Sequence, residues 1–293
     1  MNLSKLGVWS SLDSFSAPEA AAFAKRIEAW GYGALWTPES AGRNGLVSSS
    51  WLLANTTSLV IATGIVNIYG RDAIAMAAAQ LGLNEQSGGR FLLGMGVSHP
   101  PLVTGLRGHH YGKPIPAMRS YLEAMAKVTY RAPLPPEKPR TVLAALGPKM
   151  LALSGELADG AHPYNVPPEH TAQARKILGP GKLLCVEQKL ILQTDPATAR
   201  AAGRKNLYHY LAYENYTSNW KRLGFNDSDW ANQQASDRLI DAVYAWGTEK
   251  DLRERIQAHW DAGADHVCIQ AVGGDGTVGV VDENILKMLA PHG

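Results

Sequence analysis

Residues 59–97 read LVIATGIVNIYGRDAIAMAAAQLGLNEQSGGRFLLGMGV, and this stretch decides the fold class. It begins and ends with short apolar runs, Leu59–Val66 and Arg90–Val97, which are typical of buried strands. Between them, Asp72–Gln86 is rich in strong helix formers, and Gly88 stands where a helix should stop. A strand, a helix and a second strand in this order predict two parallel strands joined by a crossover helix.

The same alternation runs along the whole chain. Prolines stand where a helix tolerates them best, in the first turn of several expected helices: Pro18, Pro116, Pro148, Pro168 and Pro196. The expected strands are Lys5–Ser10, Ala34–Thr37, Leu59–Val66, Arg90–Val97, Arg140–Ala145, Gly160–Pro163, Leu183–Leu192 and Asp265–Ala271. This order predicts an α/β fold, a closed (β/α)8 TIM barrel. A doubly wound open sheet would usually carry a glycine fingerprint after its first strand, where this chain has SSLDSF.

We expect residues 1–293 to form a single barrel domain. The surplus over a minimal barrel lies mainly in residues 206–247, which are rich in Tyr, Trp, Asn and Asp. This stretch is expected to be a helical insertion between strands 7 and 8. Its aromatic residues (Tyr208, Tyr210, Tyr213, Tyr216 and Trp220) have a spacing more typical of a core or a subunit interface than of a substrate cage.

Composition narrows the class of protein. The chain has 45% hydrophobic and 18% charged residues, which indicates a compact globular fold. With 28 basic and 26 acidic residues and no basic block, nucleic acid is not an expected partner. The N-terminus lacks an apolar signal region and no apolar stretch is long enough to span a membrane, so we expect a cytoplasmic protein. Cys185 and Cys268 lie in strand-like runs and are expected to be reduced core residues, and the histidine spacing indicates no metal site.

Two polar residues directly follow expected strands, at the rim where barrel enzymes carry their active sites. Glu39 could accept a hydrogen bond from a ligand or act in acid–base catalysis, or it could cap a rim loop. His99 opens an irregular segment, Ser98–Pro114, and could exchange a proton near neutral pH. It could equally be a hydrogen-bonded loop residue, and the sequence leaves both alternatives open.

Glycines and small residues indicate places where a ligand could approach the backbone. Gly64 interrupts a β-branched run, which marks a bulge, a close approach of backbone to ligand, or relief of packing. Gly94 and Gly96 are two residues apart and share one side of their strand, which would leave room for a flat ligand. The turn 144–149 joins a strand to a helix N-terminus and contains Lys149, so it could bind phosphate or be an ordinary tight turn.

The order of these segments resembles the luciferase-like monooxygenase superfamily. The matching pieces are GVWS (7–10), AWGYGALWTPE (29–39), LVIATGIVNIYGRD (59–72), SGGRFLLGMGVSHP (87–100), AALGPKMLALSGELADG (144–160) and WDAGADHVCIQ (260–270). More narrowly, the chain is similar to the branch that uses the 8-hydroxy-5-deazaflavin coenzyme F420 in place of FMN. In that branch GLRGHHYGKPIPAMRSYLEAM (105–125) is a familiar kind of continuation.

The resemblance implies a cis peptide bond at Gly64–Ile65, which would press a bulge against the back of the deazaflavin ring. It also implies cofactor contacts, with the ring at Asn67, Val97 and Ser98 and with the phosphate-bearing side chain at Ala144, Ala145, Leu146 and Gly147. Many members have an Asp-His or His-His pair where this chain has Glu39-Ser40. The role of that histidine cannot be transferred, and Glu39 and His99 are the candidate catalytic residues.

The implied function is an oxidoreductase that transfers a hydride between coenzyme F420 and a small organic substrate. One alternative is an FMN-dependent luciferase-like monooxygenase. Another is an aldolase-type lyase that forms a Schiff base on Lys189, and a third is a cofactor-binding protein without turnover. The resemblance also leads us to expect a homodimer. The charge pattern, the short apolar stretches and the histidine spacing lead us to expect no nucleic acid, membrane or metal partner.

Overall fold

Eight parallel strands close into a barrel in the computed structural model, which describes residues 1 and 3–291. The strands are β1 (Leu6–Trp9), β2 (Ala34–Thr37), β3 (Val60–Thr63), β5 (Phe91–Gly96), β6 (Arg140–Leu143), β7 (Gly160–Ala161), β8 (Leu183–Ile191) and β10 (His266–Ala271). Each pairs with its neighbour in that order, and β10 closes the ring by pairing with both β8 and β1. The predicted barrel and all eight of its strands are confirmed.

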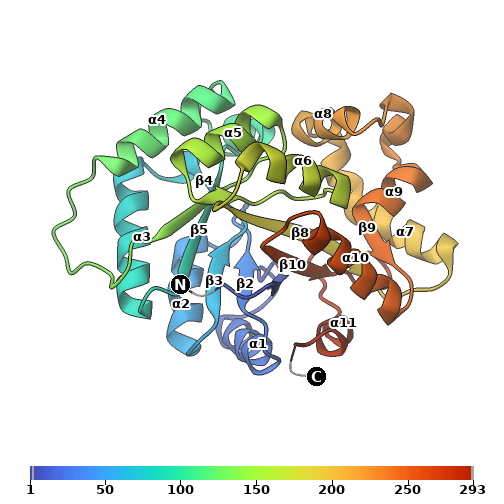
Figure 1. Cartoon of the computed structure of the whole chain (residues 1–293), viewed down its shortest axis with the longest axis horizontal. Helices are drawn as coiled ribbons and strands as arrows, with labels where there is room; N and C mark the ends of the chain where they lie inside the picture. Colours follow the sequence, from blue (N-terminus) through green and yellow to red (C-terminus); the bar gives the residue numbers. More distant parts are fainter. Residues whose placement is uncertain (2, 292–293) are drawn as a thin grey trace.

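Helices surround the strands, as Figure 1 shows. They are α1 (Ala17–Ala29), α2 (Gly45–Asn55), α3 (Ala73–Ser87), α4 (Pro114–Ala126), α5 (Pro148–Leu157), α6 (Pro168–Leu178), α7 (Pro196–Leu207), α10 (Glu249–Asp261) and α11 (Glu283–Met288). The prolines stand in first turns as predicted, except that α4 begins at Pro114 and not at Pro116. Ser16 and Glu19 form a capping box at the start of α1, where each bonds the backbone amide of the other.

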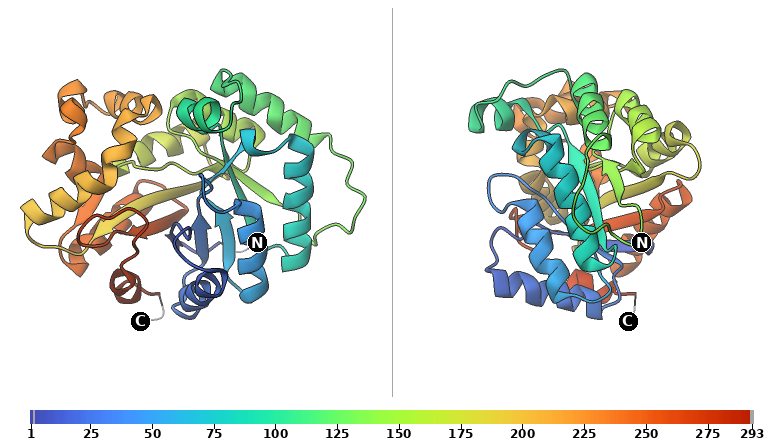
Figure 2. Two further views of the ribbon diagram at one scale, coloured as in Figure 1. Left: turned by 180° about the vertical axis from the view of Figure 1, so that it is seen from behind. Right: turned by 90° about the vertical axis from the view of Figure 1, so that its left-hand side faces the viewer.

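The insertion is helical over most of its length and ends in a strand. It contains η3 (Tyr208–Ala212), α8 (Glu214–Arg222), η4 (Asp227–Gln233), α9 (Asp237–Val243) and β9 (Tyr244–Trp246). Helices α7 to α9 and β9 gather on one side of the barrel in Figures 1 and 2. The sequence did not predict β9. It forms because β8 extends past its partner β7, and Tyr244–Trp246 pairs with the edge that β7 leaves open.

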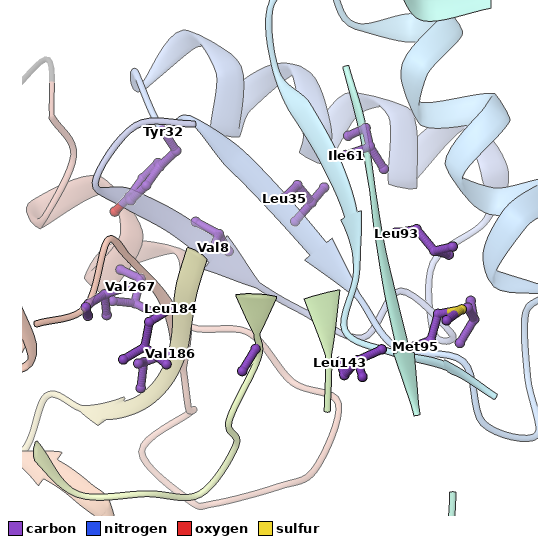
Figure 3. Close-up of a cluster of buried hydrophobic side chains, with 14 of the residues drawn as sticks. Val8, Tyr32, Leu35, Ile61, Leu93, Met95, Leu143, Leu184, Val186 and Val267 are labelled. Carbon is purple, nitrogen blue, oxygen red and sulfur yellow. The ribbon is translucent and has the colours of Figure 1, made fainter. Parts of the chain in front are cut away.

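Alternate residues of the strands face two different cores. Outward-facing residues such as Val8, Leu35, Ile61 and Leu93 pack under the helices (Figure 3). Inward-facing residues fill the barrel, among them Trp36 and both cysteines, which are fully buried and unpaired as predicted. No helix in the described part of the chain is long and apolar enough to cross a membrane.

Candidate active site at the carboxyl ends of the strands

A cis peptide bond joins Gly64 to Ile65 at the mouth of the barrel, at the position that the resemblance predicts. The chain leaves the sheet after β3 and returns to it as β4 (Val66–Asn67), which pairs with β5. The indole Nε1 of Trp9 donates a hydrogen bond to the Gly64 carbonyl at 3.0 Å. A Cβ at Gly64 would lie 2.6 Å from that nitrogen, so the bulge requires glycine.

The two glycines of β5 make room for this bulge and not for a ligand. A Cβ on Gly94 would lie 1.9 Å from the Thr63 carbonyl oxygen, and one on Gly96 would lie 2.8 Å from Cδ1 of Ile65. The same position on Gly96 is 3.2 Å from the Ala144 Cβ, so Ile65 and Ala144 both flank Gly96. The expectation of a ligand-sized space above both glycines was therefore wrong. The Thr63 carbonyl occupies the space above Gly94, and the Ile65 side chain occupies the space above Gly96.

Glu39 is buried and supports the segment that follows the bulge. Its carboxylate forms an ion pair with Arg71 and accepts hydrogen bonds from the amides of Gly45 at 3.0 Å and Asn67 at 3.2 Å. The side chain is 4% exposed. Its own amide donates to the Ile65 carbonyl at 3.2 Å. Three donors therefore converge on Glu39, as they would on a loop-capping carboxylate, and a role in proton transfer stays a prediction.

His99 lies against the insertion. Its ring stacks on Tyr213 with centroids 4.2 Å apart and planes 2° apart, and Tyr216 is tilted against it at 5.8 Å. Burial lowers the pKa of His99 below its usual value, and the Asn215 side chain acts in the opposite direction. Burial therefore favours the neutral form of the ring. The preceding residue, Ser98, has a positive φ of 57°, and Val97 before it is half-buried.

The turn after β6 has the features of an anion site. The Ala144 amide bonds the Met95 carbonyl at 2.8 Å, and the chain then enters α5 with Gly147 at the N-cap and no side chain capping the helix. The first amides of a helix have no intrahelical acceptor and attract negative charge. In α5, Pro148 has no N–H and the Met150 amide bonds the Gly147 carbonyl at 3.1 Å, which leaves the Lys149 amide for an anion. Arg222 of α8 reaches this turn, since its Nη2 would lie 3.3 Å from a Cβ on Gly147. No carboxylate in the described chain forms a salt bridge with Arg222.

A buried polar cluster lies deeper in the mouth, on β8 and the loop after β7. The Lys189 amine is 3.5 Å from the Glu187 carboxylate and donates a hydrogen bond to Oδ1 of Asn165. It is fully buried, and burial lowers its pKa. A Schiff-base lysine must meet a carbonyl carbon, whereas this amine is enclosed by its partners and by the Tyr164 ring, 3.9 Å away. The geometry therefore disfavours the aldolase alternative.

Sequence reasoning missed several residues of the rim. Trp9 and Arg222 stand in ordinary strand and helix patterns, and nothing in their local sequence marks them. His162 stacks on Trp36 inside the barrel, with ring centroids 4.4 Å apart, and its free Nε2 lies 3.1 Å from a Cβ on Gly64. Tyr164 lies in the loop after β7, and Gln270 is near the end of β10. The two side chains meet only because the barrel closes. For Tyr164, its place shortly after an expected strand was the one sequence feature that could have marked it as a rim residue.

Two of the predicted cofactor residues, Ile65 and Ala144, lie beside Gly96, and the turn that ends at Gly147 continues from Ala144. The two predicted catalytic residues have different neighbours. Glu39 contacts Arg71, whereas His99 contacts the tyrosines of the insertion. A bulge without a side chain at its tip and an arginine beside an uncapped helix N-terminus fit a flat ring with a phosphorylated side chain. Fold and rim together define a (β/α)8 barrel enzyme with a cis-peptide bulge.

Comparison with known proteins agrees with this class. A family model described as luciferase-like monooxygenase matches residues 1–266, and the chain belongs to that family. This protein is an oxidoreductase. A candidate coenzyme F420-dependent oxidoreductase of Mycobacterium tuberculosis is 25% identical over 88% of this chain and 91% of its own. The 5,10-methylenetetrahydromethanopterin reductase of Methanolobus tindarius is 32% identical, over 47% of each chain.

Solved structures share the fold across nearly the whole chain. The coenzyme F420-dependent tetrahydromethanopterin reductase of Methanopyrus kandleri superposes with a TM-score of 0.77 at 16% identity, covering 99% of this chain and 98% of the other. An F420-dependent secondary alcohol dehydrogenase gives 0.74 at 15% identity, covering 99% of each chain. The oxygenating constituent of 3,6-diketocamphane monooxygenase from Pseudomonas putida, in complex with FMN, gives 0.66 at 13% identity over 99% and 97%. These likenesses confirm the barrel.

Proposed function

We propose that this protein transfers a hydride between coenzyme F420 and a small organic substrate. The observation that carries the proposal is that the Ile65 side chain of the bulge and Ala144, the first residue of the turn after β6, lie on either side of Gly96. A ring placed against the bulge would have its phosphorylated chain directed to that turn. The curated relatives named for F420 chemistry support the same cofactor.

The family resemblance supplies the residues that would hold the cofactor, and Arg222 is added from its place beside Gly147. Gly64, Ile65 and Asn67 would form the surface behind the ring, with Val97 and Ser98 at its border. Ala144, Ala145, Leu146 and Gly147 would meet the phosphate, with Arg222 as the nearby cation. When bound, a 5-deazaflavin supplies hydride transfer and reacts poorly with oxygen, and the barrel's part is to orient the reactants and exclude water. Glu39 would keep the bulge in place. Burial favours the neutral form of His99, which makes this ring a poor donor of a proton to the substrate.

An FMN-dependent monooxygenase is the second candidate, since a structural neighbour holds FMN on the same fold. Both cofactors carry a flat ring and a phosphate, so the rim described here fits either one. The ring itself distinguishes them. A carbon replaces the flavin N5 in the deazaflavin, and the two chemistries diverge at that atom.

Fluorescence titration with F420, and separately with FMN, tests the proposal. Saturable F420 binding with FMN excluded is the expected result, and preference for FMN would make the monooxygenase primary. Arg222→Ala should weaken binding of either phosphorylated cofactor by about 10-fold, the typical value of one charge-assisted hydrogen bond. It should not change binding of the deazaflavin riboside that lacks phosphate. Lys221→Ala is the matched control, because this neighbouring cation is paired with Asp227 at 2.7 Å.

We also propose a homodimer formed through α2 and α3. These helices pack side by side and expose large apolar side chains: Val47 (70%), Trp51 (44%) and Ile74 (67%). Exposed apolar side chains on neighbouring helices are typical of a protein interface. Light scattering on the purified protein should give twice the mass of the 31.6 kDa chain, and Val47→Asp with Ile74→Asp should give the monomer mass. A wild-type monomer would contradict the assignment.

A further inference from the structure

Three polar side chains from distant parts of the sequence form a hydrogen-bonded chain at the barrel mouth. The Tyr164 hydroxyl lies 2.9 Å from Oε1 of Gln270 and 3.0 Å from the Tyr210 hydroxyl. Tyr164 follows β7, Gln270 is on β10, and Tyr210 is in η3 of the insertion. All three side chains are half-buried, so this row of hydrogen bonds is neither sealed in the core nor free in solvent. The insertion therefore contributes a polar group to the rim.

The direction of the hydrogen bonds follows from the acceptor at one end. The Gln270 carbonyl oxygen can only accept, so the Tyr164 hydroxyl donates to it and accepts from Tyr210. If the Gln270 amide turns over, its NH2 donates to Tyr164 and both hydroxyls reverse. The Tyr210 hydrogen is then free to point at a ligand. The chain can thus present Tyr210 either as an acceptor or as a donor, which is what binding an alcohol and its carbonyl would require.

The surroundings of this chain are aromatic. The ring of Tyr164 lies 5.2 Å from that of Trp9, whose indole holds the bulge. Tyr210 meets Tyr216 edge-to-face at 5.2 Å. The Lys189 amine is 3.9 Å from the Tyr164 ring and 5.2 Å from the Tyr210 ring, and the Glu187 carboxylate beside it balances its charge. The aromatic rings offer apolar contacts, and the charge of Lys189 is already balanced by Glu187. These surroundings suit a neutral molecule with an apolar body and one oxygen atom.

We propose that Tyr210, supported by Tyr164 and Gln270, binds the oxygen of a neutral carbonyl or alcohol substrate and exchanges a proton with it. This inference rests on the proposed function. In the reducing direction the carbonyl carbon gains a C–H bond from the hydride that the reduced deazaflavin supplies. The C=O π electrons move to oxygen, and that oxygen takes the proton of Tyr210. The phenolate recovers a proton from water when the alcohol leaves. Oxidation of the alcohol is the reverse.

Infrared spectroscopy of bound acetophenone tests the binding step without turnover. A hydrogen bond from Tyr210 should lower the carbonyl stretching frequency of the bound ketone, with and without F420 present. Tyr210→Phe should abolish this shift. Tyr208→Phe should retain it, since Tyr208 lies in the same turn with 48% of its surface exposed and its ring packed edge-on against His209. Gln270→Glu is a second variant in case Tyr210→Phe folds poorly. A carboxylate only accepts, so Tyr164 would donate to it and hold the Tyr210 hydrogen, and the shift should be reduced.

Reduction of acetophenone by the loaded enzyme tests the proton step. Tyr210→Phe should lower kcat by about 100-fold, as expected for loss of a general acid, with an unchanged Kd for F420. An unchanged shift or kcat in Tyr210→Phe would overturn the inference. So would a wild-type protein that binds F420 but neither binds nor reduces acetophenone, while the cofactor proposal would stand. Failure to bind F420 would refute the proposed function and leave the infrared result to decide the oxygen site.

Discussion

Replacing Glu39 by glutamine distinguishes a carboxylate that supports the bulge from one that transfers a proton. Glutamine keeps the shape but offers a single oxygen to the three donors on Glu39, namely two backbone amides and Arg71. One donor then faces an NH2 group. Arg71, whose side chain is 12% exposed, also loses its counter-charge. A charge-assisted hydrogen bond contributes about 1.5–3 kcal/mol, and breaking a fully buried pair costs about 3–5 kcal/mol.

Because this pair lies just under the surface, we expect Glu39→Gln to lower the free energy of unfolding by about 2–4 kcal/mol. In a chain of this size that corresponds to a fall in Tm of roughly 5–12 °C. Urea unfolding of the cofactor-free protein measures the change directly. The matched control is Glu156→Gln, which breaks an exposed Arg–Glu pair and should cost less than about 1 kcal/mol. A Glu39→Gln protein as stable as the wild type, yet without turnover, would refute the supporting role and favour acid catalysis.

Three further outcomes follow from the same contacts. Gly96→Ala should weaken F420 binding and lower stability by about 1–3 kcal/mol, because its Cβ would displace the Ile65 side chain at 2.8 Å, and unchanged binding would contradict this. Borohydride added with a carbonyl compound should leave Lys189 unmodified by mass spectrometry, since the amine is buried. Burial lowers the pKa of His162 and His266 to about 4 and of His259 to about 3, from 6.5. Unfolding therefore takes up protons below pH 6.5, and the urea midpoint should be lower at pH 5 than at pH 7, so equal midpoints would refute this account.

The sequence predicted the rim residues that depend on local backbone requirements. Gly64 was recognisable because a glycine in a β-branched run marks an irregular strand, and the family resemblance placed the cis bond there. The turn at Ala144–Gly147 was recognisable because a strand that ends in small residues runs straight into a helix start. In both cases the signal lies within a few consecutive residues.

Pairings between distant residues were not predictable in this way. Gly94 and Gly96 were correctly seen to leave space on one side of β5, yet only the fold shows that Ile65 fills it. Glu39 has an unexceptional position after β2, and its three donors come from residues 45, 67 and 71. Tyr210 packs against the buried cluster of the insertion, as expected, and only the fold shows that its hydroxyl also reaches Tyr164.

The sequence by itself determined the barrel, because strand and helix periodicity, proline at helix starts and the absence of a glycine fingerprint are properties of neighbouring residues. Tertiary structure alone decided which side chains meet at the rim. Closing eight strands into a ring brings their carboxyl ends together whatever their separation along the chain, and no local pattern encodes that convergence. The hydroxyl chain of Tyr210, Tyr164 and Gln270 and the reach of Arg222 to Gly147 exist for that reason.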